Sequence, residues 1–473
     1  MRRTPVVTFL AIQAVLLLWW LAFFPGLFSR DSVLYLSHTL VGPWISDHSV
    51  LYDGLTWLSV KLTGDLGALT LLQTTAMAAA LTWLAQALRR LGSPPRTTTA
   101  MAIVLAFLPP FGAFSVTMWK DVPFTACAIA IAAVSCTIAA NKTVRTRDLV
   151  ALGLLFTGLG LFRANGFLVT AIAVVVLVLV VRVMRVRLAL VGLAAAAIPM
   201  LLTSVVLPMA GIYAPSKTYV YHTAFGDLAV AFRERPEQFD PWDRAVLASV
   251  APLSRWAKGG ACHTINPLIW RGDFSWQQAD AHASELLDMW RRLLLRDPGL
   301  VVETRLCRGA IAWKITDNPH AEGGGTYHFS RRPTADFYVG PGKVPYFPET
   351  ALYTLRPLSQ PLYDVASGWL DASLNHDLDW LLWRGAFWCY LSYLAIGATA
   401  LVRRSRHVLA VGAVIVGQQL AILANISAQD YRYMASPIFI GFMLLPLLVS
   451  SASRRLRETW RRTPSAGATS SSA

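Results

Sequence analysis

The sequence has few charged residues: Asp, Glu, Lys and Arg make up 15% of its 473 residues, whereas 55% are hydrophobic. Its mean hydropathy is +0.47. Soluble domains carry about 25% charged residues, so this shortage of charge excludes an ordinary soluble protein. Apolar runs of about 20 residues, the length that crosses a bilayer, recur along the chain. They predict an all-α polytopic membrane protein.

Cysteine is also scarce, with five residues in the chain. Cys127, Cys136 and Cys389 fall inside apolar runs, where packing as a small buried side chain is the ordinary role. Cys262 and Cys307 fall in a long polar segment and are candidates for a disulfide, with their geometry left open. The sequence contains neither His-Glu-x-x-His nor Gly-x-Ser-x-Gly, so the motifs of zinc peptidases and serine hydrolases are absent.

Ten membrane spans are predicted from the apolar runs. They lie near residues 6–27, 66–88, 98–118, 122–140, 148–162, 167–181, 188–210, 378–402, 407–427 and 434–451. The N-terminal run resembles a signal peptide, but the bulky residues Trp19, Trp20, Phe23 and Phe24 occupy the place of a cleavage site. We therefore expect this run to remain as the first span.

Basic residues cluster between alternate predicted spans. Six segments, the two terminal ones included, hold 19 Lys and Arg residues against the acidic residues Asp148 and Glu458. Because positively charged loops stay on the cytoplasmic side, this pattern predicts a plasma-membrane protein with both termini cytoplasmic and a functional site on the extracytoplasmic side. The net charge of +15 is thus explained by orientation, and no nucleic-acid partner is expected.

The predicted topology divides the chain into four parts. These are an N-terminal membrane module, 1–210, whose first outer loop, 28–65, contains surface helices; a mainly helical extracytoplasmic segment, 211–377; the last spans, 378–452; and a cytoplasmic, disordered tail, 453–473. Within 284–315, Asp297-Pro298-Gly299 predicts a break between two helices. The glycine- and proline-rich stretch 320–347 predicts an irregular loop.

Polar residues at the outer ends of the predicted spans need an explanation, because ionisable groups in a membrane are costly and tend to be functional. They gather in four stretches: Asp31 with Asp47, His48 and Asp53; Lys120 with Asp121; Arg163 with Asn165; and Gln429, Asp430, Arg432 and Tyr433. At any single stretch, an ordinary interfacial turn explains the residues equally well. Taken together on one face, they predict a polar cavity for a ligand that carries phosphate.

Residue chemistry suggests a role for each group. Lys120, Arg163 and Arg432 would bind the phosphate of a donor, because Lys and Arg are the usual ligands of phosphate oxygens. Asp31 would act as a general base toward a hydroxyl. Five further residues would bind the acceptor or support the base: Asp121, Asn165, Asp47, His48 and Asp430. Asp47 beside His48 is a weak indication of a metal site, and the need for a divalent cation stays open.

Four short stretches carry a family resemblance: "FPGLFSRDSVLYL" (24–36), "WKDVPF" (119–124), "FRANGF" (162–167) and "DYRYMASPIFIGFMLLPLL" (430–448). They resemble segments of the C-type (GT-C) superfamily of polytopic glycosyltransferases, near the protein mannosyltransferase and aminoarabinose transferase group, in an uncharacterised bacterial branch. The resemblance implies transfer of a sugar, with inversion, from a polyprenyl-phosphate lipid to a hydroxyl of a cell-envelope acceptor. It also implies that Asp31 takes the place of the essential aspartate after the first span.

Two other functions remain compatible with the sequence. A lipid or glycolipid transporter or flippase would use broken spans, and Pro109-Pro110 predicts one such break. A non-catalytic envelope assembly protein would use the long segment 211–377 to engage a partner. Neither alternative requires Asp31 to react with a substrate.

Overall fold

The fold is described from a computed structural model, which covers residues 3–270, 272–316 and 350–462. Within these ranges the regular structure is helical, and the only extended pairings are three isolated β-bridges. The prediction of an all-α fold is confirmed. The predicted loop 320–347 lies outside the described residues.

Within the described residues, seven helical segments are long and apolar enough to cross a membrane. They are Pro5–Ala22, Gly67–Arg90, Asp121–Asn141, Arg185–Met209, His376–Arg403, Arg406–Ala424 and Tyr431–Ser451. The prediction of a multi-pass membrane protein is confirmed, but the count of ten spans is not. Two predicted spans correspond to α8 (Thr146–Phe162) and α9 (Gly166–Val180), which have 17 and 15 residues, fewer than the roughly 20 needed to cross a bilayer.

An eighth span is formed if two bent helices are taken together. α5 (Pro95–Phe107) and α6 (Pro109–Val116) meet at an angle of 63°. Pro109 and Pro110 occupy the first positions of α6, where proline cannot donate the backbone hydrogen bond that would continue α5. The predicted break at Pro109-Pro110 is therefore confirmed.

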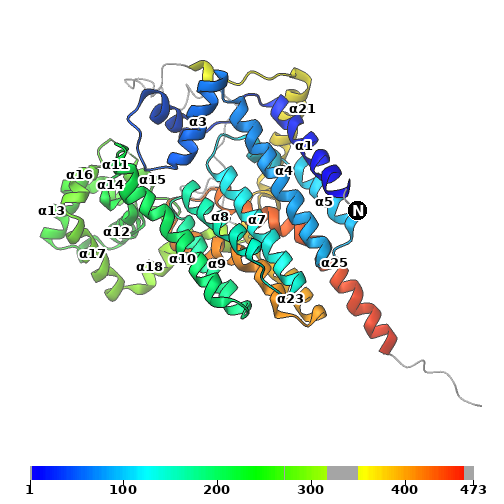
Figure 1. Cartoon of the computed structure of the whole chain (residues 1–473). Coiled ribbons are helices and arrows are strands. Elements are labelled where there is room, and N and C mark those ends of the chain that lie inside the picture. Colours follow the sequence, from blue (N-terminus) through cyan, green and yellow to red (C-terminus); the bar gives the residue numbers. More distant parts are fainter. Residues whose placement is uncertain (1–2, 271, 317–349, 463–473) are drawn as a thin grey trace, which may run out of the picture.

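The membrane bundle is built around α7 (Asp121–Asn141), which packs against α4 (Gly67–Arg90) and α8. α7 is rich in alanine, and small side chains allow helices in a membrane to approach closely. The remaining long helices complete the bundle (Figure 1). They are α1 (Arg3–Ala22), α9, α10 (Arg185–Leu201), α23 (Gly385–Arg403), α24 (Ala413–Ala424) and α25 (Ala435–Arg462). Because α25 continues to Arg462, residues 453–462 are helical and do not belong to the predicted disordered tail.

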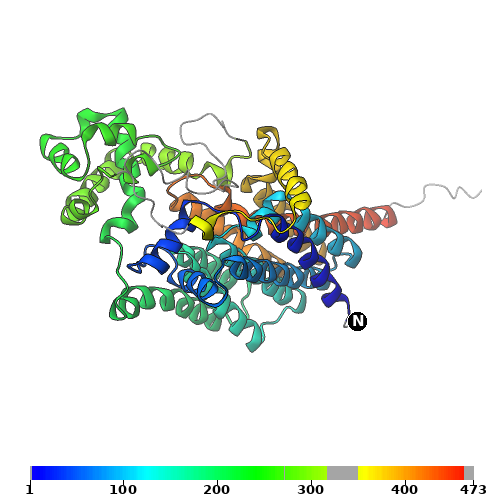
Figure 2. The same cartoon turned by 90° about the horizontal axis from the view of Figure 1, so that it is seen from above.

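A second group of helices lies apart from the bundle, at the end of the molecule opposite the far end of α25 (Figures 1 and 2). It comprises α12 (His222–Glu234), α13 (Pro241–Val250), α14 (Leu253–Lys258), α15 (Asn266–Ile269), α16 (Trp276–Ala281), α17 (Ala283–Arg296) and α18 (Pro298–Arg308). Its buried hydrophobic residues, from Phe225 to Val301, form a core of their own. α17 ends and α18 begins at Asp297, whose side chain accepts a hydrogen bond from Leu300 N, so the predicted break is confirmed.

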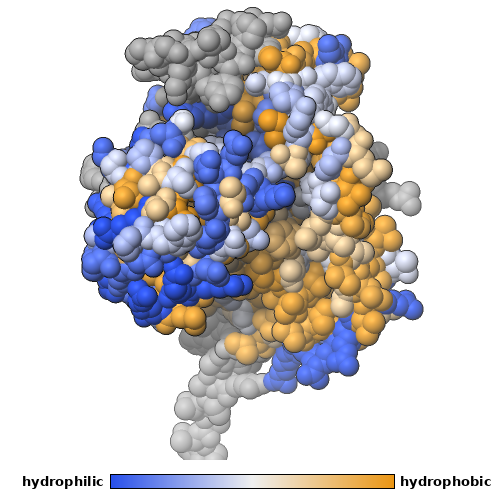
Figure 3. Space-filling model, turned by 90° about the vertical axis from the view of Figure 1, so that its left-hand side faces the viewer, coloured by the Kyte–Doolittle hydropathy of each residue, from blue (hydrophilic) through white to orange (hydrophobic). Residues whose placement is uncertain are grey.

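The other helices of the described chain are short. α2 (Arg30–Leu36), a π-helical turn (Ser37–Val41) and α3 (Val50–Thr63) follow the first span, as the predicted surface helices of 28–65. α11 (Leu207–Met209), α19 (Ala310–Trp313), α21 (Gln360–Ser373) and α22 (Asp379–Leu382) complete the described α-helices. The surface changes from hydrophilic over one region to a broad hydrophobic area beside it (Figure 3). Such an area is expected where helices contact lipid.

Candidate functional site

The start of α2 is fixed to the turn between α6 and α7. Leu27 and Thr117 form a parallel bridge, and Met118 N donates to Leu27 O at 2.8 Å. The Ser32 hydroxyl donates to Met118 O at 2.8 Å, and the Trp119 indole donates to Ser29 Oγ at 2.6 Å. These buried hydrogen bonds hold Asp31, in the first turn of α2, beside Lys120 and Asp121 at the start of α7.

Gln73, a buried polar residue of α4, ties the broken span to the surface helices. Its amide donates to Thr117 O at 2.9 Å, and its carbonyl oxygen accepts a hydrogen bond from the Tyr52 hydroxyl at 2.6 Å. A buried amide needs such partners because leaving it unsatisfied in an apolar interior is costly. Gln73 therefore positions the turn that precedes Lys120 relative to α3.

The central contact of the site joins residues 401 positions apart: Arg432 Nη1 donates to Asp31 Oδ2 at 2.5 Å. Arg432 Nη1 also lies 3.8 Å from Asp121 Oδ2, and Arg432 Nε lies 2.9 Å from Asp430 Oδ2. The guanidinium is 5.0 Å from the centre of the Trp119 ring, within cation–π range. Arg432 is thus surrounded by three carboxylates and packed on an aromatic face.

Arg163 approaches the same cluster from the end of α8. It donates to Asp121 Oδ1 at 2.6 Å, and its guanidinium lies 4.4 Å from the centre of the Tyr433 ring. Asp121 is 1% exposed and stands at the N-terminus of α7, where the helix dipole stabilises negative charge. Asp121 therefore connects the two arginines.

Lys120 differs from the two arginines. Among the described residues, no carboxylate oxygen lies within 4.0 Å of its ammonium, which instead lies 5.9 Å from the centre of the Tyr35 ring. Burial lowers the pKa of Lys120, although the nearby carboxylates of Asp31 and Asp121 oppose this change. Among the described residues, Lys120 is consequently the cation of the cluster whose charged group has no carboxylate within 4.0 Å.

Asp31 is ionised in this arrangement. Burial alone would raise its pKa, but electrostatic interactions, above all with Arg432, outweigh that effect and hold the pKa of Asp31 well below its usual range. A carboxylate with so low a pKa is a weak base. Any ligand that draws Arg432 away from Asp31 would raise the pKa of Asp31 and make Asp31 a stronger base.

The structure brings together six of the residues singled out from the sequence. They are Asp31, Asp121, Asp430, Lys120, Arg163 and Arg432. Their three negative and three positive charges balance. Asn165 is the N-cap residue of α9 without a side-chain capping bond, and within the described chain no contact joins its side chain to this charge cluster. Asp47 and His48 form a neighbouring group with His38 and Asp53.

Two aromatic residues of the site, Tyr35 and Trp119, were not singled out from the sequence, whereas Tyr433 was. Tyr35 separates Lys120 from His48, with ring centres of Tyr35 and His48 5.4 Å apart, while Trp119 and Tyr433 contact the arginines. Trp and Tyr are common at membrane interfaces, so their presence in these stretches carried no separate signal. Only the cation–π geometry distinguishes them from interfacial anchors.

No protein-family model, curated protein or solved structure matches this chain. The resemblance to C-type glycosyltransferases stays a prediction.

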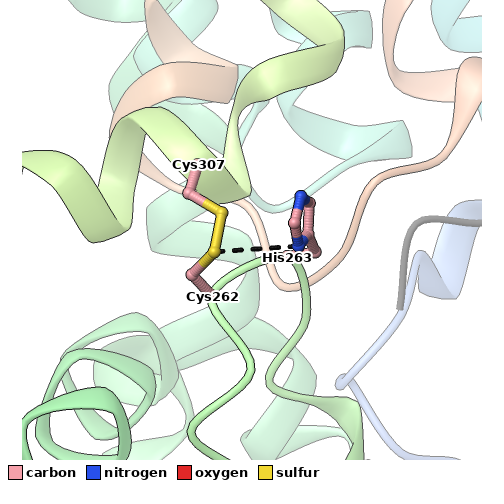
Figure 4. Close-up of side chains that lie close together, drawn as sticks. All are labelled: Cys262, His263 and Cys307. Atoms are coloured by element: carbon pink, nitrogen blue, oxygen red, sulfur yellow. Dashed lines mark hydrogen bonds between the residues drawn. A yellow bond between two sulfur atoms is a disulfide. The ribbon is translucent and has the colours of Figure 1, made fainter. Parts of the chain in front are cut away.

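A disulfide joins Cys262 to Cys307 of α18, with Cα atoms 5.7 Å apart (Figure 4). His263 lies beside it, with Nδ1 3.7 Å from Cys262 Sγ. A cavity of about 710 Å³ adjoins these residues, and its lining within the described chain includes no residue of the charge cluster. The disulfide therefore belongs to the helical group 222–308 and not to the candidate site.

Replacing both Cys262 and Cys307 with serine is expected to destabilise this helical group by about 2–4 kcal/mol, because the cross-link restricts the unfolded chain. Thermal unfolding of the purified protein with and without reductant measures the effect. Reductant should lower the unfolding temperature of the original protein and leave that of the double variant unchanged. Equal unfolding temperatures for the oxidised protein and the variant would contradict the expectation.

Proposed function

We propose that this protein is a membrane glycosyltransferase that moves a sugar from a polyprenyl-phosphate donor to an acceptor hydroxyl. The observation that carries the proposal is the charge cluster, in which α2, the start of α7, the end of α8 and the turn before α25 contribute charged side chains to one buried place. Ionisable residues gathered at the end of a membrane bundle are costly unless they serve a ligand or one another. The cluster combines cations suited to phosphate with a carboxylate suited to a hydroxyl.

Donor binding begins at Lys120, the cation without a carboxylate within 4.0 Å among the described residues. The donor phosphate then competes with Asp31 for Arg432, whose guanidinium can bind two oxygens at once. As Arg432 turns to the phosphate, the pKa of Asp31 rises toward that of an ordinary carboxyl group. Binding of the donor thereby activates the base.

In the transfer step, the acceptor oxygen forms a bond to the anomeric carbon from the face opposite the phosphate. The bond between that carbon and the phosphate oxygen breaks, and the polyprenyl phosphate leaves with the electron pair. Asp31 takes the hydroxyl proton, and the configuration at the sugar is inverted. Arg432 stabilises the negative charge that develops on the leaving phosphate, while Lys120 holds the phosphate throughout.

The disulfide supports an extracytoplasmic position for the helical group 222–308, because disulfides persist in oxidising compartments. This group is linked to the site through the bridge between Thr264 and Ala428, and Ile265 N donates to Ser427 O at 2.9 Å. Polyprenyl-phosphate donors present on the outer leaflet would then reach the cluster from the side that the basic loops avoid.

Replacing Lys120 with methionine is expected to raise the KM for the donor about 10–100-fold, the cost of losing one charge-assisted hydrogen bond of about 1.5–3 kcal/mol. kcat should change less, because Lys120 contacts the phosphate before and after transfer. Steady-state kinetics with radiolabelled polyprenyl-phosphate sugars measure both. Lys61→Met, at an exposed lysine of α3, is the matched control, and an unchanged KM in Lys120→Met would contradict this role.

The proposed function itself is tested with purified protein in lipid vesicles, a panel of radiolabelled polyprenyl-phosphate sugars and an extract of cell-envelope acceptors. Label that moves from the lipid into a new covalent product supports the proposal. Label that stays on the lipid for every donor, with protein that is folded and inserted, contradicts it.

The broken span favours a second candidate, a transporter or flippase of lipid-linked sugars. α5 and α6 are bent by 63° relative to each other, and α6 leads into the turn that carries Lys120. Broken helices commonly form transport sites. The same vesicles separate the two functions. A flippase would move a fluorescent lipid-linked sugar between leaflets and leave it chemically unchanged.

A further inference from the structure

A second polar cluster lies on the other side of Tyr35, built from His38, Asp47, His48 and Asp53. The groups form a chain: Asp53 Oδ2 is 3.9 Å from His38 Nδ1, which is 3.8 Å from Asp47 Oδ1. Asp47 Oδ1 is in turn 3.4 Å from His48 Nδ1. We refer to these four residues as the His–Asp chain.

The His–Asp chain comes from one short region of sequence folded back on itself. His38 lies in the π-helical turn after α2, Asp47 and His48 in the connection that follows, and Asp53 in the first turn of α3. π-Helical turns occur often at functional sites. The turn and α3 are packed together, and the connection between them is also held by a bridge between Ile45 and Tyr213.

Three of these side chains are largely buried, the Asp47 carboxylate is 19% exposed, and several of the polar atoms lack hydrogen bonds. Asp53 is 0% exposed, and the side chains of His38 and His48 are 6% and 9% exposed. Within the described residues, none of the atoms that converge has a hydrogen-bond partner of good geometry: His38 Nδ1, His48 Nδ1, Asp47 Oδ1 and both Asp53 oxygens. An unsatisfied buried carboxylate is strongly unfavourable.

A shared cation would satisfy all of these atoms. Two ligand atoms that each lie about 2.1 Å from a tetrahedral ion are about 3.4 Å apart, close to the 3.4–3.9 Å separations along the chain. Because the chain is open, with no three of its residues offering ligand atoms within 4.8 Å of one another, side-chain rotations are needed to close it around one ion. Imidazole and carboxylate ligands together favour first-row transition ions, whereas Mg²⁺ and Ca²⁺ favour oxygen ligands alone.

We propose that His38, Asp47, His48 and Asp53 form a binding site for one divalent transition-metal ion. The ion neutralises Asp47 and Asp53 and fixes the connection 42–49 against α3. This assigns Asp47 and His48 to metal binding, in place of the acceptor-binding role expected from the sequence. The proposal does not depend on sugar transfer, since metal binding is measured without donor or acceptor.

In the described chain, the group of three ligand residues whose atoms all lie within 4.8 Å of one another is Cys262, His263 and Cys307, whereas no three residues of the His–Asp chain are that compact. Their two sulfur atoms are joined in a disulfide, and metal binding by cysteine requires thiolates. This group is therefore a control for the proposed site, provided that reductant is kept out of the experiment.

The test uses the full-length protein, purified in detergent without reductant, stripped with a chelator and dialysed against Zn²⁺ or Mn²⁺. Elemental analysis then gives the metal retained per chain, and thermal unfolding reports stabilisation by the ion. We expect about one ion per chain with at least one of the two metals. His38→Gln and Asp53→Asn should each weaken retention by at least about 10-fold, as losses of metal-site residues typically do.

Two variants serve as matched controls. His282→Gln removes an imidazole from a surface pair with Glu285, and Cys262→Ser with Cys307→Ser removes the sulfur atoms of the compact group. Both should retain the ion as the original protein does. If Asp53→Asn fails to fold, Asp47→Asn replaces it, because that carboxylate is 19% exposed.

Retention far below one ion per chain with both metals would overturn the proposal. Equal retention in the original protein and in His38→Gln and Asp53→Asn would also overturn it, as would loss of the metal only in the cysteine variant. Loss of sugar transfer with normal metal retention would count against the proposed function and leave the metal site intact.

Discussion

Replacing Asp31 with asparagine is expected to slow sugar transfer by about 10²–10⁴-fold, the usual contribution of a general base. Asparagine has nearly the shape of aspartate and cannot accept the acceptor's proton. The rate is measured with labelled polyprenyl-phosphate sugar in vesicles. Asp288→Asn, which removes an exposed carboxylate paired with Arg291 on α17, is the matched control and should keep the full rate.

The contact between Asp31 and Arg432 makes this prediction sharper. Because Arg432 is bound to Asp31 at 2.5 Å without donor, Asp31→Asn frees the guanidinium for phosphate. Donor binding should therefore be unchanged or tighter while kcat falls. A purely structural role for Asp31 would weaken both, and full activity of Asp31→Asn would disprove the mechanism.

Replacing Asp227 with asparagine is expected to destabilise the helical group 222–308 by about 3–5 kcal/mol, the cost of leaving a buried charge without its partner. Asp227 is 1% exposed and accepts hydrogen bonds from Arg305 at 2.6 Å, Arg308 at 3.2 Å and the Trp290 indole at 3.0 Å. Burial lowers the pKa of Arg308 to about 10 even with Asp227 beside it. The variant would leave this guanidinium buried and uncompensated.

Thermal unfolding and resistance to a protease measure the loss of stability in the purified Asp227→Asn variant. The exposed pair Asp288–Arg291 again provides the control, since surface ion pairs contribute about 0–1 kcal/mol. Adding Arg308→Met to Asp227→Asn should recover part of the stability, because no charge is then left unpaired. An Asp227→Asn variant as stable as Asp288→Asn would contradict the prediction.

Local features of the sequence were enough for the fold class and for several helix ends. Long apolar runs predict membrane helices because the bilayer requires apolar side chains and internally satisfied backbone groups over about 20 residues. Pro109-Pro110 and Asp297-Pro298-Gly299 end helices through effects that reach only a few residues. Hydropathy predicted spans at α8 and α9 because both are largely apolar, but their lengths of 17 and 15 residues leave the count of ten spans unconfirmed.

The candidate site was likewise predictable from the sequence only in part. The residue types at Asp31, Lys120, Arg163 and Arg432 were visible in the sequence, because charge beside an apolar run is unusual. Their partners were not: Arg432 meets Asp31 across 401 residues, and Arg163 meets Asp121 across 42. The pairing of His38 with Asp47 and Asp53 depends on how the π-helical turn packs on α3.

The sequence by itself determined that this chain is an all-α, multi-pass membrane protein, because hydrophobic length and proline act locally along the chain. Only the tertiary structure decided which charges meet and which buried atoms lack partners. Those contacts depend on the relative positions of helices far apart in sequence, which are set by the packing of many side chains together. Asp31 is accordingly a charged residue near a span in the sequence, and an ionised carboxylate bound to Arg432 in the fold.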